Sequence, residues 1–348
     1  MSFTVVLIVP TGVGAAIGGY AGDALPVARA VSQISDRLIT HPNVLNGAQL
    51  YWSLDNTYYV EGYALDRFAA GNWGLHPIRQ NQVGLLLDRG IEPELRLRHI
   101  QAADATRATL GLSLTDYVVT DAPLEVELRT AKSGASWGTI GNPGSLLRAA
   151  DKLINQGGAE AIAVVARFPD DDDSIELQNY RHGAGVDCLA GAEAVISHLI
   201  VRNFGIPAAH APALKPLAVD PEVSPRAAAE ELGYTFLPCV LVGLSRAPQF
   251  VTQSGSFSPE TIWSNSVDAA IVPYSACGGS AILSFASLST EIIAVTNNST
   301  QINVPPEPLG IKVTQVNSYL EALGILVARK AGIDPQVFHP DISSLRSL

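Results

Sequence analysis

The chain contains few of the residues that define several protein classes. Its 348 residues include three cysteines, Cys188, Cys239 and Cys277, which are far apart and form no C-x-x-C pair. An odd number of scattered cysteines excludes a disulfide framework and indicates a reducing compartment. Basic residues are also scarce, with 22 Lys and Arg against 33 Asp and Glu. Because phosphate neutralisation needs clustered cations, we expect no nucleic-acid partner.

The amino terminus lacks the features of an export or membrane signal. It has no basic n-region and no A-x-A-like cleavage site, and the apolar run 3–9 is too short to span a bilayer. We therefore expect a cytoplasmic protein with no membrane partner.

What the chain does contain favours an α/β fold. Hydrophobic residues make up 47% of the sequence, charged residues only 16%, and there are 30 glycines. This composition suits parallel strands that are buried on both faces and joined by tight loops. We predict mainly parallel, Rossmann-like sheet layers with helices on both faces, arranged in one or two lobes.

Strand-like and helix-like patterns alternate along the chain. Predicted strands cover 3–9, 37–39, 57–60, 83–88, 116–121, 161–168, 237–244, 269–272 and 291–296. Predicted helices cover 24–34, 92–109, 145–156, 189–203, 224–232, 281–288 and 318–331. Ser224-Pro225 reads as an N-cap followed by an N1 proline. The stretches 43–75 and 169–190 do not follow the alternation, and the acidic run 170–173 is expected to be a solvated loop.

We divide the chain into an N-terminal α/β lobe, 1–128, and a C-terminal α/β lobe, 129–348. The first lobe holds a glycine loop at 11–23, and the second holds glycine loops at 133–145 and 275–280. The proline-rich segment 210–225 is the alternative position for the boundary.

The loop 11–23 lies between a predicted strand and a predicted helix, where bare backbone N–H groups can bind an anion. Ile17 stands where a dinucleotide fingerprint has its third glycine, so no nicotinamide cofactor is assigned. The alternative is that the glycines serve a tight turn and close packing. The ligand-binding candidates in this loop are Thr11, Gly12, Gly14, Gly18 and Gly19.

Two later segments offer further anion contacts. Arg129 and Lys132 introduce a loop rich in small residues, where a guanidinium fork or an ammonium can hold a carboxylate or phosphate. A surface loop with ion pairs to Asp121, Glu125 and Glu127 is the alternative. Arg246 follows the predicted strand 237–244, and Cys277 is expected to be a buried small residue. The remaining candidates are Ser133 and Ser136 in the second loop and Ser275, Gly278 and Gly279 in the third.

Histidines and carboxylates supply the candidates for acid–base chemistry. One of His41, His182, His198 or His210 would serve as acid or base, and Asp187 shares a glycine-rich loop with His182. A metal-dependent hydrolase or lyase using His182, Asp187, His198 and His210 is an alternative. Glu193 and His198 are five residues apart on a predicted helix, and H-E-x-x-H spacing is absent. We therefore assign no metal ligand.

Four long motifs carry a resemblance to a known family. They are 9–19 (VPTGVGAAIGG), 40–48 (THPNVLNGA), the loop 133–145 and 191–198 (GAEAVISH). With these motifs the chain resembles an uncharacterised family of cyanobacteria and plastids, known as domain of unknown function 3326. The resemblance implies a soluble protein of a photosynthetic cell, in the cytoplasm or, for plant relatives, in the plastid stroma. It supplies no activity, no cofactor and no catalytic residues.

The leading hypothesis is an enzyme that binds a small anionic metabolite, phosphorylated or carboxylated, in a cleft of glycine-rich loops. The first alternative is a non-catalytic regulatory or assembly protein that contacts its partner through Tyr51, Trp52 or Trp73. The second is the metal-dependent hydrolase or lyase. The sequence leaves the oligomeric state open, a homo-oligomer included.

Overall fold

Two parallel sheets form the centre of the structure, a computed structural model that describes residues 2–46, 50–170, 174–232, 237–252, 258–342 and 344–345. The larger sheet is entirely parallel. Its strand order is β14 (Thr314–Val316), β13 (Glu291–Val295), β12 (Ala269–Pro273), β1 (Thr4–Leu7), β2 (Arg37–Thr40), β3 (Thr57–Tyr59). The smaller parallel sheet has the order β10 (Ala208–Ala213), β9 (Ala161–Arg167), β5 (Val83–Leu87), β6 (Val118–Val119). The α/β prediction is confirmed.

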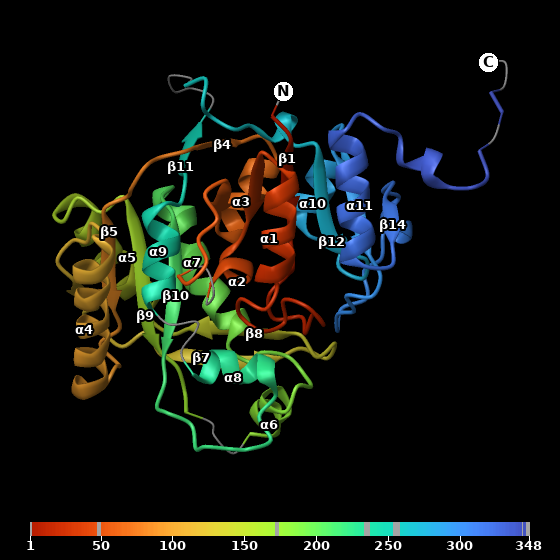
Figure 1. The fold of residues 1–348 in the computed structure, drawn as a ribbon. Coiled ribbons are helices and arrows are strands. Elements are labelled where there is room, and N and C mark those ends of the chain that lie inside the picture. The colour runs from red at the N-terminus through yellow and green to blue at the C-terminus, as the bar shows by residue number, and fades with distance from the viewer. Residues whose placement is uncertain are drawn as a thin grey trace.

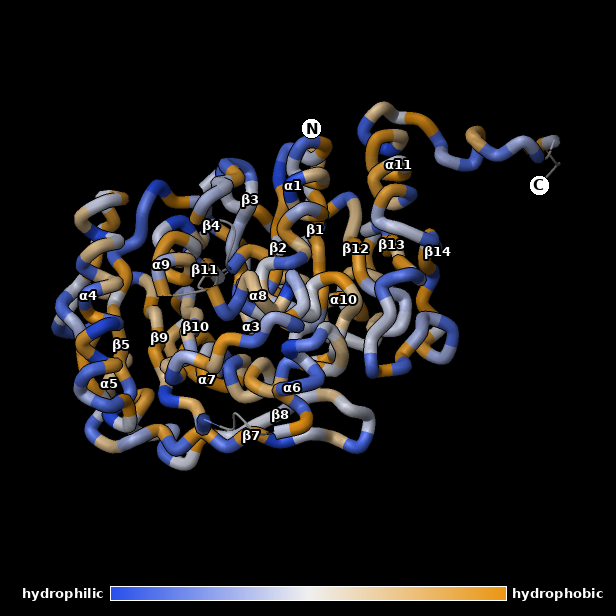
Figure 2. The backbone as a smooth tube through the Cα atoms, turned by 60° about the horizontal axis from the view of Figure 1, so that its bottom comes forward, coloured by the Kyte–Doolittle hydropathy of each residue, from blue (hydrophilic) through white to orange (hydrophobic). Residues whose placement is uncertain are grey.

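The strands are buried because helices cover both faces of each sheet. Along β1, Val5 and Leu7 pack into one hydrophobic cluster and Val6 into another, on opposite faces. Figure 2 shows the strands of this sheet in the colours of hydrophobic residues. An apolar residue at every position of a strand is typical of a parallel sheet covered on both sides.

The covering helices share their faces in pairs. On the larger sheet, α1 (Leu25–Ile34) and α11 (Tyr319–Lys330) contact each other on one face, and α3 (Gly62–Ala69) and α10 (Ser280–Ala286) contact each other on the opposite face. On the smaller sheet, α4 (Pro93–Leu110) packs with α9 (Leu237–Ser245), and α5 (Pro143–Asn155) packs with α7 (Ala190–Phe204). Each of the seven predicted helices corresponds to one of these helices or to α8 (Pro225–Glu231). The Ser224 side chain caps α8 by accepting from Ala227 N, as predicted.

Each sheet takes strands from both sides of residue 128. The larger sheet combines β1 to β3 with β12 to β14, and the smaller combines β5 and β6 with β9 and β10. The chain leaves the larger sheet after β3 and returns to it with β12 (Figure 1). The expected boundary between 128 and 129 therefore does not separate the sheets.

Two predicted segments have a different structure from the one expected. The predicted strand 237–244 is the buried helix α9. A short apolar run fits a buried helix as well as a buried strand, and its periodicity cannot separate the two. The loop predicted after Arg129 is the antiparallel hairpin of β7 (Val126–Thr130) and β8 (Ser136–Ile140).

Shorter elements complete the chain. The stretch 43–75 contains α2 (Pro42–Leu45), β3, α3 and β4 (Trp73–His76), which pairs with β11 (Gln249–Thr252). The stretch 169–190 contains α6 (Ile175–Arg181). Of the acidic run 170–173, Asp170 pairs with Arg167 and Lys215, and residues 171–173 lie outside the described ranges. In the parts of the chain that the structure describes, no helix is both long and apolar enough to cross a membrane.

Candidate functional site

A large cavity opens at the carboxyl ends of strands from both sheets. Its volume is about 1750 Å³, above the roughly 300–1,000 Å³ of ordinary small-molecule pockets. Pro10 and His41 line it just beyond β1 and β2, and Leu214 lines it just beyond β10. Helices α3, α4, α6, α7 and α8 contribute to the remaining lining, together with the segments that connect them. Ligands of open parallel sheets collect at this edge, so the cavity is the candidate site.

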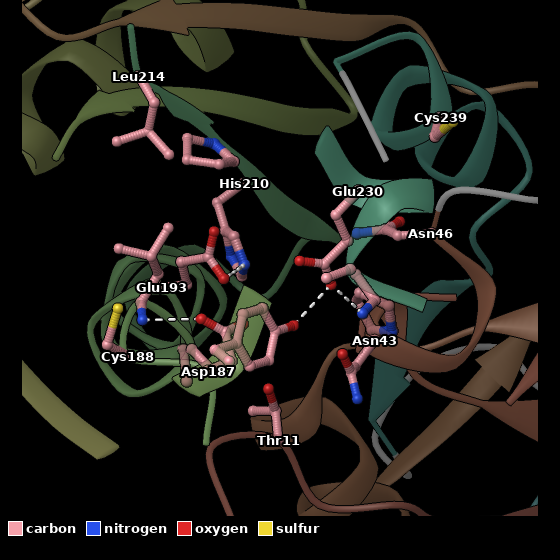
Figure 3. Close-up of a pocket in the computed structure, with 18 of the residues that line it drawn as sticks. Thr11, Asn43, Asn46, Asp187, Cys188, Glu193, His210, Leu214, Glu230 and Cys239 are labelled. Atoms are coloured by element: carbon pink, nitrogen blue, oxygen red, sulfur yellow. Dashed lines mark hydrogen bonds and ion pairs between the residues drawn. The ribbon is translucent and has the colours of Figure 1, made fainter. Parts of the chain in front are cut away.

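The His210 imidazole is held between a hydroxyl and a carboxylate. Its Nδ1 lies 2.6 Å from Oγ of Ser197, and its Nε2 lies 3.5 Å from Oε2 of Glu193 (Figure 3). Glu193 and Ser197 are one helical turn apart on α7, so they share a face of that helix, which β10 packs against. A neutral ring with its proton on Nε2 satisfies both contacts, and so does an imidazolium.

Asp187 lies just before the amino terminus of α7. Its Oδ1 accepts a hydrogen bond of 2.8 Å from Leu189 N. Burial and the negative charge of Glu193 raise the pKa of Asp187 to about 7, against the opposing effects of the helix amides and His210. A carboxyl with this pKa is present in both protonation states near neutral pH, so it can donate or accept a proton.

A further carboxyl, Glu230 of α8, reaches the same space from the opposite side (Figure 3). It accepts a hydrogen bond of 2.9 Å from the Tyr180 hydroxyl and a second one from Ala21 N. Burial and the charges of Asp187 and Glu193 raise the pKa of Glu230 well above its usual value. We refer to Asp187, Glu193 and Glu230 as the carboxyl cluster.

A separate carboxylate–histidine pair lines the cavity between α3 and α7. Glu61 is 4% exposed and caps α3, where its Oε2 accepts from Tyr63 N at 2.8 Å and from Ala64 N at 3.2 Å. Its Oε1 lies 2.5 Å from Nδ1 of His198. Burial disfavours the charged ring, but the adjacent Glu61 carboxylate outweighs it and raises the pKa of His198. Because His198 follows Ser197 directly, it projects from a different face of α7 than His210's partners.

His41 is buried at the end of β2, and it also lines the cavity. Its Nε2 accepts a hydrogen bond of 3.0 Å from Val9 N. Burial lowers the pKa of His41 to about 4, so the ring is neutral at physiological pH.

In the first glycine loop, backbone N–H groups donate hydrogen bonds to acceptors within the protein itself. Ala16 N donates to the Ser299 carbonyl at 3.0 Å, and Ile17 N donates to Asn298 Oδ1 at 2.9 Å. Gly18 N donates to Asp23 Oδ1 at 2.5 Å. Of the five candidates in this loop, Thr11 lines the cavity, whereas Gly12, Gly14, Gly18 and Gly19 are outside its lining.

Close packing accounts for these glycines. A Cβ added at Gly12 would lie 2.7 Å from Ser136 Oγ, and one at Gly14 would lie 2.9 Å from a methyl group of Val186. Both residues also have positive φ, which L side chains rarely adopt. The arrangement corresponds to the packing alternative set out from the sequence.

The structure disperses the remaining anion-binding candidates. Arg129 lines the cavity, but it pairs with Glu127 at 2.8 Å and lies 5.0 Å above the Trp137 ring. Lys132 and Ser133 are exposed in the turn between β7 and β8, and Ser136 Oγ accepts from Gly191 N. Arg246 follows a helix rather than a strand and lies 3.7 Å from Asp55.

In the third loop, Gly278 and Gly279 line the cavity, and Ser275 bonds Thr300 at 2.8 Å. Cys277 is fully buried, as expected, and burial raises its pKa to about 11. The other cations of the lining have carboxylate partners: Arg98 with Glu94, Arg181 with Glu231, and Lys215 with Asp170.

The four residues of the metal hypothesis are not gathered in one place. His182 pairs with Asp220 at 2.9 Å and is outside the cavity lining, whereas Asp187, His198 and His210 belong to it. Within the described ranges, no three His, Cys, Asp or Glu side chains are placed to hold a metal ion.

Sequence reasoning missed Ser197, Glu230, Tyr180 and Glu61. The spacing of Glu193 and Ser197 on a helix that precedes a strand containing His210 was a usable signal. Glu230 gave no such signal, because two adjacent glutamates in a short helix are typical of a solvated surface.

Comparison with known proteins places the chain among its relatives. A family model described as "Protein of unknown function (DUF3326)" matches residues 4–339. An "Uncharacterized lipoprotein" of Synechococcus sp. is 61% identical over 339 residues, which cover 97% of this chain and 94% of the relative. No solved structure matches.

The name of this relative corrects one expectation from the sequence. The Synechococcus protein is named a lipoprotein, which contradicts the cytoplasmic assignment made from the amino terminus.

Proposed function

The chain belongs to the DUF3326 family of proteins of unknown function, and we propose that it is an enzyme whose cavity carries out general acid–base chemistry on a small organic substrate. The observation that carries the proposal is the contact set of His210, which lies between Ser197 and Glu193. Asp187 lies in the same part of the cavity, and its pKa is affected by both Glu193 and His210 (Figure 3). Titratable groups whose pKa values are displaced by burial and by each other, in one cavity, are typical of catalytic sites.

The contacts suggest separate roles for these residues. Asp187, with its pKa near neutrality, exchanges a proton with the substrate. Glu193 and Ser197 fix the orientation of the His210 ring, and His210 balances part of the negative charge next to Asp187. Burial and the neighbouring carboxylates raise the pKa of Glu230 and so favour its protonated form, which is a hydrogen-bond donor on the opposite side.

The lining favours an uncharged substrate group beside the carboxyl cluster. A phosphate or carboxylate there would meet two or three carboxyls, while the cations of the lining already have carboxylate partners. Apolar side chains such as Leu65, Leu95 and Leu214 cover other parts of the cavity. We therefore propose a neutral, partly apolar substrate in place of the small anionic metabolite.

A ligand screen tests the proposal. Purified protein would be screened by thermal shift against neutral carbonyl compounds, sugars, amines and phosphorylated metabolites, and each hit assayed for conversion. We expect neutral compounds to raise the melting temperature and to be converted, and Asp187→Asn to abolish conversion. His182→Gln is the matched control, because His182 lies outside the lining. Hits that are converted equally by Asp187→Asn would contradict the proposal.

One observation favours the assembly alternative as a second candidate. Tyr51 is 64% exposed and Trp52 is 54% exposed, with the Arg29 guanidinium 3.5 Å above the Trp52 ring. Trp73, by contrast, stacks on Phe250. Tyr and Trp are enriched among the residues of protein–protein interfaces. A stoichiometric partner that is lost in Trp52→Ala, while ligand binding in the cavity persists, would support this function.

A further inference from the structure

We infer that His41 is a fixed hydrogen-bond donor to a carbonyl oxygen of the substrate, and that the reaction is therefore a proton transfer at the carbon next to that carbonyl. The inference rests on the proposed acid–base function and adds a substrate class to it.

The tautomer of His41 follows from its contact with the backbone. A backbone N–H can only donate, so the bond from Val9 N requires a lone pair on Nε2 of His41. The neutral ring must then carry its proton on Nδ1. Burial lowers the pKa of the ring to about 4, which keeps it neutral throughout the physiological range.

Among the residues that the structure describes, none accepts the Nδ1 proton. His41 is 8% exposed and lines the cavity, and no acceptor of the described residues contacts its Nδ1. Unpaired donors on a buried side chain are rare in folded proteins. A donor of this kind facing a cavity points to an acceptor on the ligand.

The position of His41 makes the donor rigid. Thr40, the preceding residue, ends β2 and donates its hydroxyl proton to the Leu7 carbonyl at 2.7 Å. Val9, which fixes the ring, follows β1, the strand that pairs with β2. The ring is therefore held by two paired central strands, and preorganised donors are those that lower the energy of a developing negative charge most.

A neutral donor suits an oxygen that gains charge during the reaction. In the proposed step, the Asp187 carboxylate takes a proton from the carbon next to the carbonyl. The C–H electron pair forms a carbon–carbon double bond, and the carbonyl π pair moves to oxygen. The oxygen, now an enolate, accepts the hydrogen bond from His41 Nδ1, which retains its proton. Asp187 then returns its proton to carbon, at the same or a neighbouring position, so atoms and charge balance.

The first test is the protonation of His41 in the full chain. Long-range ¹H–¹⁵N spectra of ¹⁵N-labelled protein between pH 5.5 and 8, with His41→Gln used for assignment, should show a neutral ring with its proton on Nδ1. A positively charged ring at pH 7, or a proton on Nε2, would overturn the inference without touching the proposed function.

The second test uses simple neutral ketones in D₂O, cyclohexanone among them, with deuterium incorporation next to the carbonyl followed by NMR. We expect catalysed exchange, a loss of about 10²–10³-fold in His41→Leu, and a smaller loss in His41→Gln, whose amide can accept from Val9 and still donate. Circular dichroism checks that both variants fold.

The outcomes separate the two ideas. If no ketone is exchanged, or if His41→Leu exchanges as fast as wild type, the carbonyl inference is wrong. If other compounds are converted by wild type and not by Asp187→Asn, the acid–base function stands without it. Deuterium exchange that persists in Asp187→Asn would contradict both the carbonyl inference and the proposed acid–base function.

Discussion

The first glycine loop and the carboxyl cluster both adjoin the cavity, but their polar groups are in opposite states. In the loop, amides at Ala16, Ile17 and Gly18 bind acceptors within the protein, and a side chain at Gly12 or Gly14 would collide with a neighbour. In the cluster, like charges are brought together in a half-buried space and pKa values rise in consequence. Hydrogen bonds that are complete within the protein stabilise the fold, whereas carboxyls whose pKa values are displaced within a cavity are typical of a site that acts on a ligand.

The largest expected effect is a loss of catalysis when a member of the carboxyl cluster is replaced. Replacing Asp187 by Asn removes the proton acceptor and keeps the hydrogen bond from Leu189 N. We expect turnover of any identified substrate to fall by about 10²–10⁴-fold, the usual contribution of a general acid or base. The matched variant Asp220→Asn, whose carboxyl pairs with His182 away from the cluster, should retain wild-type turnover. Equal losses of turnover in both variants would show that the carboxyl cluster has no role different from that of other acidic residues in the cavity lining.

The next largest effect is expected on stability. It compares Gly19 and Gly279, which the sequence analysis both named as anion-binding candidates. A Cβ at Gly19 would lie 2.2 Å from the Ala15 carbonyl oxygen, whereas one at Gly279 would meet nothing within 4 Å. Gly19→Ala should lower the free energy of unfolding by about 3 kcal/mol, and Gly279→Ala by less than about 0.5 kcal/mol. Urea denaturation measures both. Similar values for the two variants would mean that the first loop can relax and is not the packing device described above.

Elements that depend on the local sequence could be predicted, whereas contacts between distant parts of the chain could not. Strands such as Val83–Leu87 and helices such as α11 follow from local hydrophobic patterns and caps, and they were correctly predicted. The helix α9 was not, because Leu237–Leu244 is apolar at nearly every position and its period is hidden. His41, Asp187 and His210 were named as candidates from residue type and loop context.

The partners of these candidate residues could not be predicted from the sequence, for a physical reason. Glu230 joins the carboxyl cluster only because α8 folds back over residues far away in the chain, and Glu61 reaches His198 across two helices. Such long-range contacts leave no mark on local composition. The pairing of β1 with β12 across most of the sequence is a contact of the same kind.

A smaller effect is expected in the pH dependence of stability. A carboxyl whose pKa is higher in the folded state makes that state bind more protons, so its contribution to stability is lost as pH rises from the unfolded pKa through the folded one. For Glu230 this window begins at about pH 4.5 and extends upward to the raised pKa of the folded state. Glu230→Gln removes the titration and can still accept from Tyr180 and Ala21.

The measurement is urea denaturation at pH 5, 6.5 and 8. As the pH rises from 5 to 8, the free energy of unfolding of the wild type should fall relative to that of Glu230→Gln, because only the wild type has a buried carboxyl whose stabilising protonation is lost. Asp55→Asn is the control, because the Asp55 side chain is 96% exposed. Parallel curves for wild type and Glu230→Gln would show that the carboxyl is solvated and paired, and the cluster would no longer differ from the loop.

The smallest effect is expected at Lys132, the cation that the sequence placed in an anion-binding loop. The structure puts it in the exposed turn between β7 and β8, outside the cavity lining. Lys132→Ala should change the free energy of unfolding by less than about 0.5 kcal/mol, as surface substitutions do, and leave the binding of neutral ligands unaltered. Isothermal titration with inorganic phosphate provides the discriminating control. Phosphate bound by wild type and lost in Lys132→Ala would place an anion site on the hairpin, separate from the carboxyl cluster in the cavity.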